Sequence, residues 1–143
     1  MKVDLPGGFE LDDDRDRVDV DAVHRFLVDE AYWVRGRSRE TIARLVREST
    51  RVLAAYAPDG SLAGFARVMS DASNMAWLGD VFVLEEHRGR GIGTALVREA
   101  VEDPRFSDCL WYLGTRDAHG LYAKFGFARA DPARTMIRPR RED

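Results

Sequence analysis

The sequence predicts a single α/β (α+β) domain in which helices flank a mixed, mostly antiparallel central sheet. Three observations support this fold class: the hydrophobic period changes along the chain, a turn tripeptide separates two strand-like runs, and the composition is that of an ordinary globular protein. The chain has 143 residues, of which 45% are hydrophobic and 33% charged, as expected for one compact domain. No repeat or linker-like tract divides it, so one domain is expected over residues 1–143.

Helical periodicity dominates the first third of the chain, after a short strand expected at 9–11. Apolar residues recur at helical spacing over 20–34, where Asp19 or Asp21 can cap the helix. A second helix is expected to begin at Ser38, because the next apolar residues form one stripe. The expected order therefore opens with a strand and two helices.

Strand-like patterns follow, and the clearest of them is a hairpin. Two runs, 50–57 and 61–68, are joined by Pro58-Asp59-Gly60, in which proline presets the first turn dihedral and glycine tolerates a positive φ. A further strand at 77–84 is too continuously apolar to have a wet face. The remaining expected elements are a helix at 92–102, a buried strand at 109–113, a helix at 118–125 and a last strand at 135–137.

The charge pattern excludes several classes of function. A net charge of −3 argues against a general nucleic-acid binder. The sequence contains no run of about 18 apolar residues, so no membrane span is expected. Cys109 is the single cysteine and the three histidines are scattered, so neither a disulfide framework nor a metal site is expected. We expect a cytoplasmic protein. Acidic residues crowd the first 21 positions, either as solvated surface or as a rim that attracts a cationic substrate.

The segment RGRGIG, residues 88–93, followed by Thr94, stands between an apolar strand and an amphipathic helix. Backbone N–H groups at such a junction lack intrahelical partners and converge with the positive end of the helix dipole. Glycines let an anion approach the backbone, and two arginines add positive charge. The physical chemistry of this loop predicts a phosphate site, and a plain tight turn with surface arginines is the simpler alternative.

The spacing of these glycines does not match the two best-known nucleotide loops. No lysine follows them as a Walker loop requires, and the third glycine comes one position too early for a Rossmann fingerprint. A nucleotide-binding protein therefore remains a weaker alternative.

Two motifs resemble those of the GCN5-related N-acetyltransferase (GNAT) family. Residues 81–96 resemble its cofactor signature, [Q/R]-x-x-G-x-[G/A] after a strand, with Arg88, Gly91 and Gly93 at the fixed places. Residues 119–127 resemble the later LYxKxGF helix at the expected distance. The order of elements also matches, so the resemblance covers essentially the whole chain.

The resemblance implies transfer of an acetyl group from acetyl-CoA, as co-substrate, to an amine by direct attack in a ternary complex, with no metal. It places the coenzyme pyrophosphate on the glycine loop and the pantetheine arm along the edge of the preceding strand. Many relatives carry an asparagine where this chain has Thr115, whose hydroxyl could take over that contact. The expected coenzyme-binding residues are Phe82, Val83, Arg88, Gly89, Arg90, Gly91, Ile92, Gly93, Thr94 and Thr115.

The transfer requires an acid and a base. Tyr122 stands at the position of the family's usual acid, where it would stabilise the leaving thiolate; packing as a core tyrosine is the alternative. Asp80, just before the apolar strand run, is the first candidate for the base. His119, at the start of the later helix, and ordered water, which many relatives use, are the alternatives. The resemblance also allows a homodimer.

The resemblance implies that the acceptor is a small-molecule or peptide amine, whose identity the sequence leaves open. The linker with Trp33 and Arg35, followed by Arg37 and Arg39, falls where relatives place the loop that covers the acceptor. Its arginines could hold a carboxylate or a phosphate, or they could be solvated. Two other functions stay open: a non-catalytic module that binds acyl-CoA, and a transferase that uses another acyl-CoA.

Overall fold

The computed structural model describes residues 1–29 and 36–141. Within them a six-stranded sheet has the order β1-β2-β3-β4-β5-β6, and all neighbours are antiparallel except β5 and β6, which are parallel. The strands are β1 (Lys2–Asp4), β2 (Glu10–Asp12), β3 (Arg51–Tyr56), β4 (Leu62–Ser70), β5 (Met75–Val83) and β6 (Leu110–Tyr112). The helices are α1 (Val20–Asp29), α2 (Arg39–Glu48), α3 (Ile92–Val101) and α4 (His119–Ala123).

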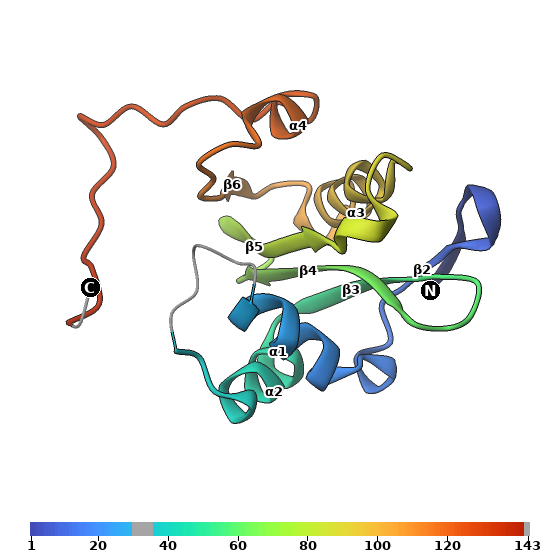
Figure 1. Ribbon diagram of the computed structural model, residues 1–143. Coiled ribbons are helices and arrows are strands. Elements are labelled where there is room, and N and C mark those ends of the chain that lie inside the picture. Colours follow the sequence, from blue (N-terminus) through green and yellow to red (C-terminus); the bar gives the residue numbers. More distant parts are fainter. Residues whose placement is uncertain (30–35, 142–143) are drawn as a thin grey trace.

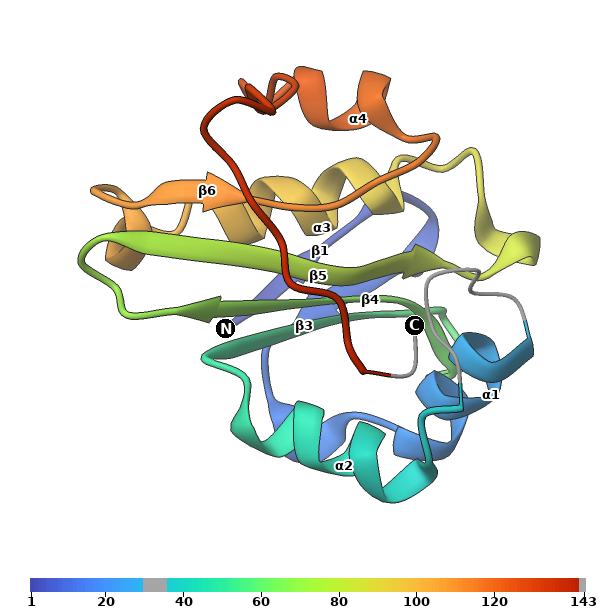
Figure 2. The same ribbon diagram turned by 90° about the vertical axis from the view of Figure 1, so that its left-hand side faces the viewer.

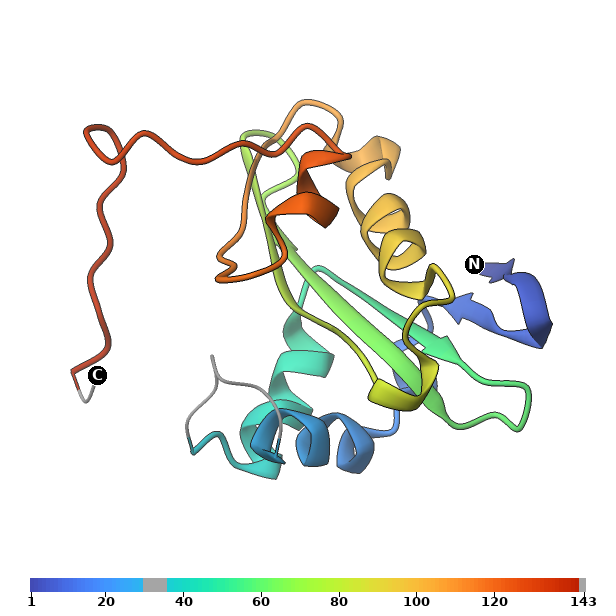
Figure 3. The same cartoon turned by 45° about the horizontal axis from the view of Figure 1, so that its top comes forward.

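Helices cover both faces of the sheet. Figures 1 and 3 show α1 and α2 on one face and α3 with α4 on the other. Each face has its own core cluster: Phe65 and Phe82 pack with Phe26 of α1, whereas Leu53 and Val68 pack with Leu96 of α3. The predicted fold class is thus confirmed.

The structure contains the turn at 58–60 and the helix cap at Ser38 that the sequence predicts. The 58–60 turn closes the β3–β4 hairpin, where the Ala57 N–H donates to the Ser61 carbonyl over 2.9 Å. Ser38 caps α2, because its side chain accepts a hydrogen bond of 3.1 Å from the Thr41 N–H. The described part of the first predicted helix ends at Asp29.

Three expectations differ from the structure. β1 was not predicted, and it pairs with β2 through Val3 and Leu11. β6 was expected to be buried, yet Leu110 is 62% exposed because this strand lies at the edge of the sheet. Residues 135–137 form no strand, and Met136 is 96% exposed. The apolar stretch there is too short to bury much surface, and prolines on either side of it limit backbone pairing.

The acidic residues near the N-terminus are partly structural. Asp13 pairs with Arg51, which is 7% exposed, donates to the Glu99 carbonyl over 2.7 Å and also pairs with Asp103. Asp12 pairs with Arg17. A carboxylate that neutralises a neighbouring guanidinium contributes little net attraction for a cationic substrate, so these pairs weaken the idea of an acidic rim.

Gly64 of β4 permits the close contact between the sheet and α3. A Cβ atom at this position would lie 2.9 Å from the Phe82 carbonyl oxygen and 3.1 Å from a Leu96 methyl group. The first neighbour is backbone and cannot move without disturbing β5. Packing at this point therefore requires glycine.

We predict that Gly64→Ala lowers the free energy of unfolding by about 1–3 kcal/mol, the usual cost of overpacking. Gly120→Ala in α4 is the matched control, because a Cβ there meets nothing within 4 Å. It should be neutral or slightly stabilising, since alanine favours helix. Urea unfolding measures both variants, and equal effects would show that the space around Gly64 is not limiting.

Candidate functional site

The site is built where β5 and β6 separate. Their parallel pairing lasts for three residues and ends at Trp77 opposite Tyr112. β5 continues to Val83, whereas the chain after β6 turns away toward α4 (Figure 2). A pocket of about 590 Å³ lies at this separation, lined from both sides by residues that include Val81 and Tyr122. An open strand edge beside a pocket can receive an extended ligand by backbone pairing.

A bulge in β5 turns Asp80 toward this pocket. The register with β4 shifts between Phe65 and Arg67, so β5 carries the extra residue. Asp80 has φ of 50°, in the left-handed region that non-glycine residues rarely adopt, and is 9% exposed. A bulge that re-aims a buried polar side chain is typical of a functional position.

Two arginines hold the Asp80 carboxylate. Arg37 donates from its two Nη atoms to the two carboxylate oxygens, over 3.1 and 2.8 Å, and Arg67 donates from Nε to Oδ2 over 2.6 Å. Burial alone would raise the pKa of Asp80, but the hydrogen bonds and charges of the two guanidiniums lower it to about 2. A carboxylate held in this way is a weak proton acceptor, which argues against our first candidate for the base.

The glycine loop leads into α3 as the sequence indicates. Gly89 and Gly91 both have φ of 80°, and a Cβ atom on either would meet nothing within 4 Å. These glycines therefore serve backbone conformation and leave open space above the loop. The Ala95 N–H makes the first helical bond, to Gly91, so the three preceding N–H groups have no intrahelical acceptor and can bind an anion.

The other predicted loop residues lie in different surroundings. Ile92 is 3% exposed, so only its backbone N–H can serve a ligand. The Arg88 Nε donates to the Val83 carbonyl over 3.0 Å, which ties the loop to β5. The Arg90 guanidinium lies 5.2 Å from the centre of the Phe9 ring, toward the β1–β2 hairpin, in a cation–π contact.

Alternation along β5 distinguishes Val83 from Phe82. The Leu84 N–H donates to Ala63 of the preceding strand over 2.8 Å, so the adjoining Val83 carbonyl points to the open edge. The Phe82 carbonyl instead faces β4, close to Gly64, and its ring stacks on Phe26 at 4.0 Å. The Val83 carbonyl therefore lies on the open edge, whereas the Phe82 carbonyl is turned inward. Contact of either residue with the pantetheine arm stays a prediction, and this geometry favours Val83.

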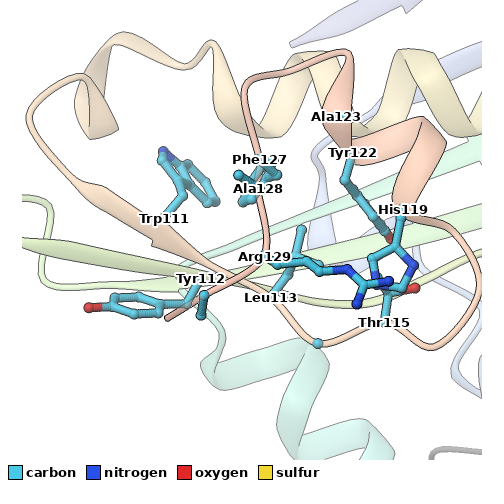
Figure 4. Close-up of a pocket in the computed structure, with 12 residues that line it drawn as sticks. Trp111, Tyr112, Leu113, Thr115, His119, Tyr122, Ala123, Phe127, Ala128 and Arg129 are labelled. Carbon is cyan, nitrogen blue, oxygen red and sulfur yellow. The ribbon is translucent and has the colours of Figure 1, made fainter. Parts of the chain in front are cut away.

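Tyr122 stands at the junction of two pockets. It is 8% exposed and lines both the 590 Å³ pocket and a neighbouring one of about 530 Å³. Figure 4 shows Tyr122 and His119 projecting from α4 into the second pocket, near Thr115. The Thr115 Oγ1 accepts a hydrogen bond from the Ala118 N–H over 3.1 Å, so this residue helps to start α4. Its hydroxyl hydrogen can still be donated to a ligand.

The structure adds three pocket residues that the sequence did not identify: Arg67, Trp77 and Arg116 line the 590 Å³ pocket with Asp80. Arg37, one of the linker arginines named from the sequence, lines it as well. Arg67 carried a detectable signal, because it is a charged residue inside an otherwise apolar strand run. The predicted acceptor residues, Trp33 and Arg35, lie outside the described residues.

The described residues contain neither a membrane-spanning helix nor a metal-binding group of side chains. No helix in 1–29 or 36–141 is long and apolar enough to cross a bilayer. Across the same ranges, no three His, Cys, Asp or Glu side chains are grouped so that they could hold a metal ion.

Comparison with known proteins identifies the family. The sequence profile described as "Acetyltransferase (GNAT) family" matches residues 37–127, more than half of the chain. The chain belongs to the GNAT family. This GNAT domain has a TM-score of 0.87 and 35% identity to a structure assigned to the same family from Xanthomonas campestris pv. campestris, with 95% of each chain covered. A second structure, assigned as an acetyltransferase from Deinococcus radiodurans R1, has a TM-score of 0.76, 21% identity and coverage of 99% and 94%; it shows the fold alone.

Two curated relatives share part of this GNAT domain. Mycothiol acetyltransferase of Nocardia farcinica is 37% identical over 84 residues, which cover 59% of this chain and 25% of the relative. Streptothricin acetyltransferase of Streptomyces lavendulae is 38% identical over 85 residues, covering 55% and 45%. The matched regions span less than half the length of either relative.

We predict that Asp80→Asn lowers the free energy of unfolding by about 2 kcal/mol or more at pH 7, because two mostly buried guanidiniums lose their counter-charge. The pKa of Asp80 is lowered in the folded state, so its contribution is full above pH 4 and is lost as the pH falls toward 2. The difference between wild type and variant should shrink over that window. Urea unfolding at several pH values measures it, with the exposed Asp108→Asn as control. If the difference in unfolding free energy between wild type and Asp80→Asn did not change with pH, the lowered pKa of Asp80 would be contradicted.

Proposed function

We propose that this chain transfers an acetyl group from acetyl-CoA to a primary amine by direct attack in a ternary complex. The observation that carries the proposal is the separation of β5 and β6, which leaves the edge of β5 open beyond Trp77, beside the pocket lined by Val81 and Tyr122. We assign the N–H groups at the start of α3 to the diphosphate, the Val83 edge to the pantetheine arm and the Tyr122 hydroxyl to the leaving thiolate. The two curated relatives are named for acetyl transfer, which favours acetyl over a longer acyl group.

The donor half of the site fits the coenzyme. The backbone N–H groups of Ile92, Gly93 and Thr94 would bind the diphosphate at the positive end of the α3 dipole. The Val83 edge would pair with the amide groups of the pantetheine arm and offer a backbone N–H to charge that develops on the acyl oxygen. Acetyl-CoA supplies the activated thioester, and the chain supplies binding and orientation.

Tyr122 is the group proposed to stabilise the leaving thiolate. Full proton transfer from a phenol of pKa about 10 to a thiol of pKa about 8.5 is uphill by roughly 2 kcal/mol. A hydrogen bond from the phenol to the developing thiolate, with the proton drawn later from the amine, therefore needs less driving force. The buried position of Tyr122 between the two pockets suits this role, because a low dielectric strengthens the bond.

The acceptor must lose a proton before it can attack, since an alkyl ammonium has a pKa of about 10.4. Asp80 is already bonded to Arg37 and Arg67, so we propose that it positions these arginines and that water accepts the proton. Positive charge around the pocket favours loss of this proton, because like charges disfavour the ammonium form of the acceptor and lower its pKa.

The activity is tested by incubating the purified chain with acetyl-CoA and a panel of amines and reading the free thiol. Amine-dependent thiol release supports the transferase. Coenzyme binding without release would favour an acyl-CoA-binding module, and competition by succinyl-CoA would reveal another acyl preference. If ATP or NAD raised the melting temperature more than coenzyme A did, the loop would belong to a nucleotide site.

We predict that Thr94→Glu weakens coenzyme A binding by about 10- to 100-fold, because a carboxylate would stand at the phosphate site. The fold should survive, since an acid in the first turn of a helix is favourable. Thr41→Glu is the matched control: Thr41 holds the same place in α2, three residues after its cap, as Thr94 does in α3. Coenzyme-induced melting shifts measure both variants. Unchanged affinity in Thr94→Glu would rule out the proposed cradle.

We predict that Tyr122→Phe lowers kcat by about 10- to 1000-fold and leaves the KM for acetyl-CoA nearly unchanged, because the hydroxyl acts on the leaving group. Tyr56→Phe makes the same chemical change at a residue that lines neither pocket, where the hydroxyl is buried and has no hydrogen-bond partner among the described residues. It should keep full activity. Steady-state kinetics decide, and a Tyr122→Phe enzyme as fast as wild type would assign this tyrosine to packing alone.

A further inference from the structure

The pocket beside Asp80 carries an excess of positive charge, and this excess bears on the acceptor. Among the described residues, its charged lining consists of four arginines and two aspartates: Arg37, Arg67, Arg116, Arg140, Asp80 and Asp117. The chain as a whole has a net charge of −3, so the local excess is opposite in sign to the protein. A pocket of one sign with low-dielectric walls concentrates ligands of the opposite sign.

Asp80 orients two of these arginines without satisfying them. A guanidinium has five N–H donors, whereas one carboxylate has about four lone-pair sites, so a single aspartate cannot pair all the donors of Arg37 and Arg67. The Nη1 atom of Arg67 is buried and has no hydrogen-bond partner in the described part of the chain. The cluster formed by Asp80, Arg37 and Arg67 therefore has more hydrogen-bond donors than its one carboxylate can accept from.

The cluster is also held in place before any ligand binds. Arg67 is 11% and Arg37 18% exposed by side chain, and charge-assisted bonds to a buried carboxylate fix both planes. A guanidinium held in this manner loses little entropy on binding a second carboxylate or a phosphate. Trp77 and Tyr122 line the same pocket and can cover the apolar part of a small acceptor.

We propose that the acceptor is an amine that also carries an anionic group, a carboxylate or a phosphate, bound by the Arg37–Arg67 pair. The inference rests on the proposed acetyl transfer and adds the substrate class. Simple polyamines are disfavoured, because they would place ammonium groups beside several guanidiniums. The opposite expectation, an acidic rim for a cationic substrate, loses support because Asp12 and Asp13 are engaged with Arg17 and Arg51.

The test compares matched amines that differ in the anionic group: glycine with glycinamide, β-alanine with β-alaninamide, and O-phosphoethanolamine with ethanolamine, with putrescine as a dication. We expect kcat/KM of the preferred amine with an anionic group to exceed that of the partner that lacks this group by at least about 10-fold. The carboxylate and phosphate pairs separate the two chemistries. The preference should weaken at high salt, because the guanidiniums are partly solvent-exposed.

Substitution of Arg37 links the preference to the cluster. Arg37→Gln should reduce the ratio toward one, mainly by raising KM for the anionic amine, and Arg37→Lys should restore part of it. Arg44→Gln is the control, because Arg44 lies on the exposed face of α2 with a side chain that is 70% exposed; it should leave the ratio unchanged. A loss confined to kcat, equal for both members of each pair, would mean that Arg37 only supports the fold.

A binding measurement without turnover keeps this inference separate from the proposed function. N-acetyl-β-alanine and N-acetylglycine, which cannot accept a second acetyl group on nitrogen by this reaction, should raise the melting temperature more than their amides do. If amines without an anionic group, or the dicationic putrescine, react as well as those with one, the substrate class is wrong and acetyl transfer stands. If no amine releases thiol, acetyl transfer fails, and the melting shifts still decide whether the cluster binds anions.

Discussion

The Asp80 carboxylate between two guanidiniums is the interaction on which the geometry of the site depends. A buried charge is costly unless it is paired and hydrogen-bonded, so Arg37 and Arg67 must remain where Asp80 can reach them. Arg67 belongs to β4 and Arg37 to the segment before α2. The ion cluster therefore fixes the end of that segment to the sheet, and it does so at the point where β5 bulges toward the pocket.

The half of the site that we propose for the coenzyme depends on the backbone more than on side chains. A strand edge becomes available because β6 ends after three paired residues, and helix N–H groups become available because Gly89 and Gly91 adopt positive φ values without crowding the space above them. Both features are built from groups that every residue possesses. This explains how a segment with apolar side chains, such as Val81 and Val83, can form a binding surface for a polar cofactor.

The two halves of the proposed site would contribute differently to substrate specificity. Backbone contacts of the kind proposed for the coenzyme tolerate many side chains. The pocket proposed for the acceptor is instead lined by four arginines, a tryptophan and two aspartates from different parts of the chain. A fold shared with other GNAT structures therefore leaves the acceptor open. In this chain, the charge of the pocket is the physical property that narrows the choice.

The sequence by itself determined the fold class, the hairpin at 58–60, the cap at Ser38 and the glycine loop before α3. These are local features, set by hydrophobic period, turn residues and capping over a few neighbouring positions. Tertiary structure decided the rest. The pairing of Asp80 with Arg37 and Arg67 joins residues 43 and 13 positions apart, and the direction of the Phe82 carbonyl depends on strand register. The exposed 135–137 segment has too little apolar surface to form a strand, so the prediction from its local pattern was wrong. Register, burial and long-range charge pairing arise only when the chain packs, because each depends on partners that no short window of sequence contains.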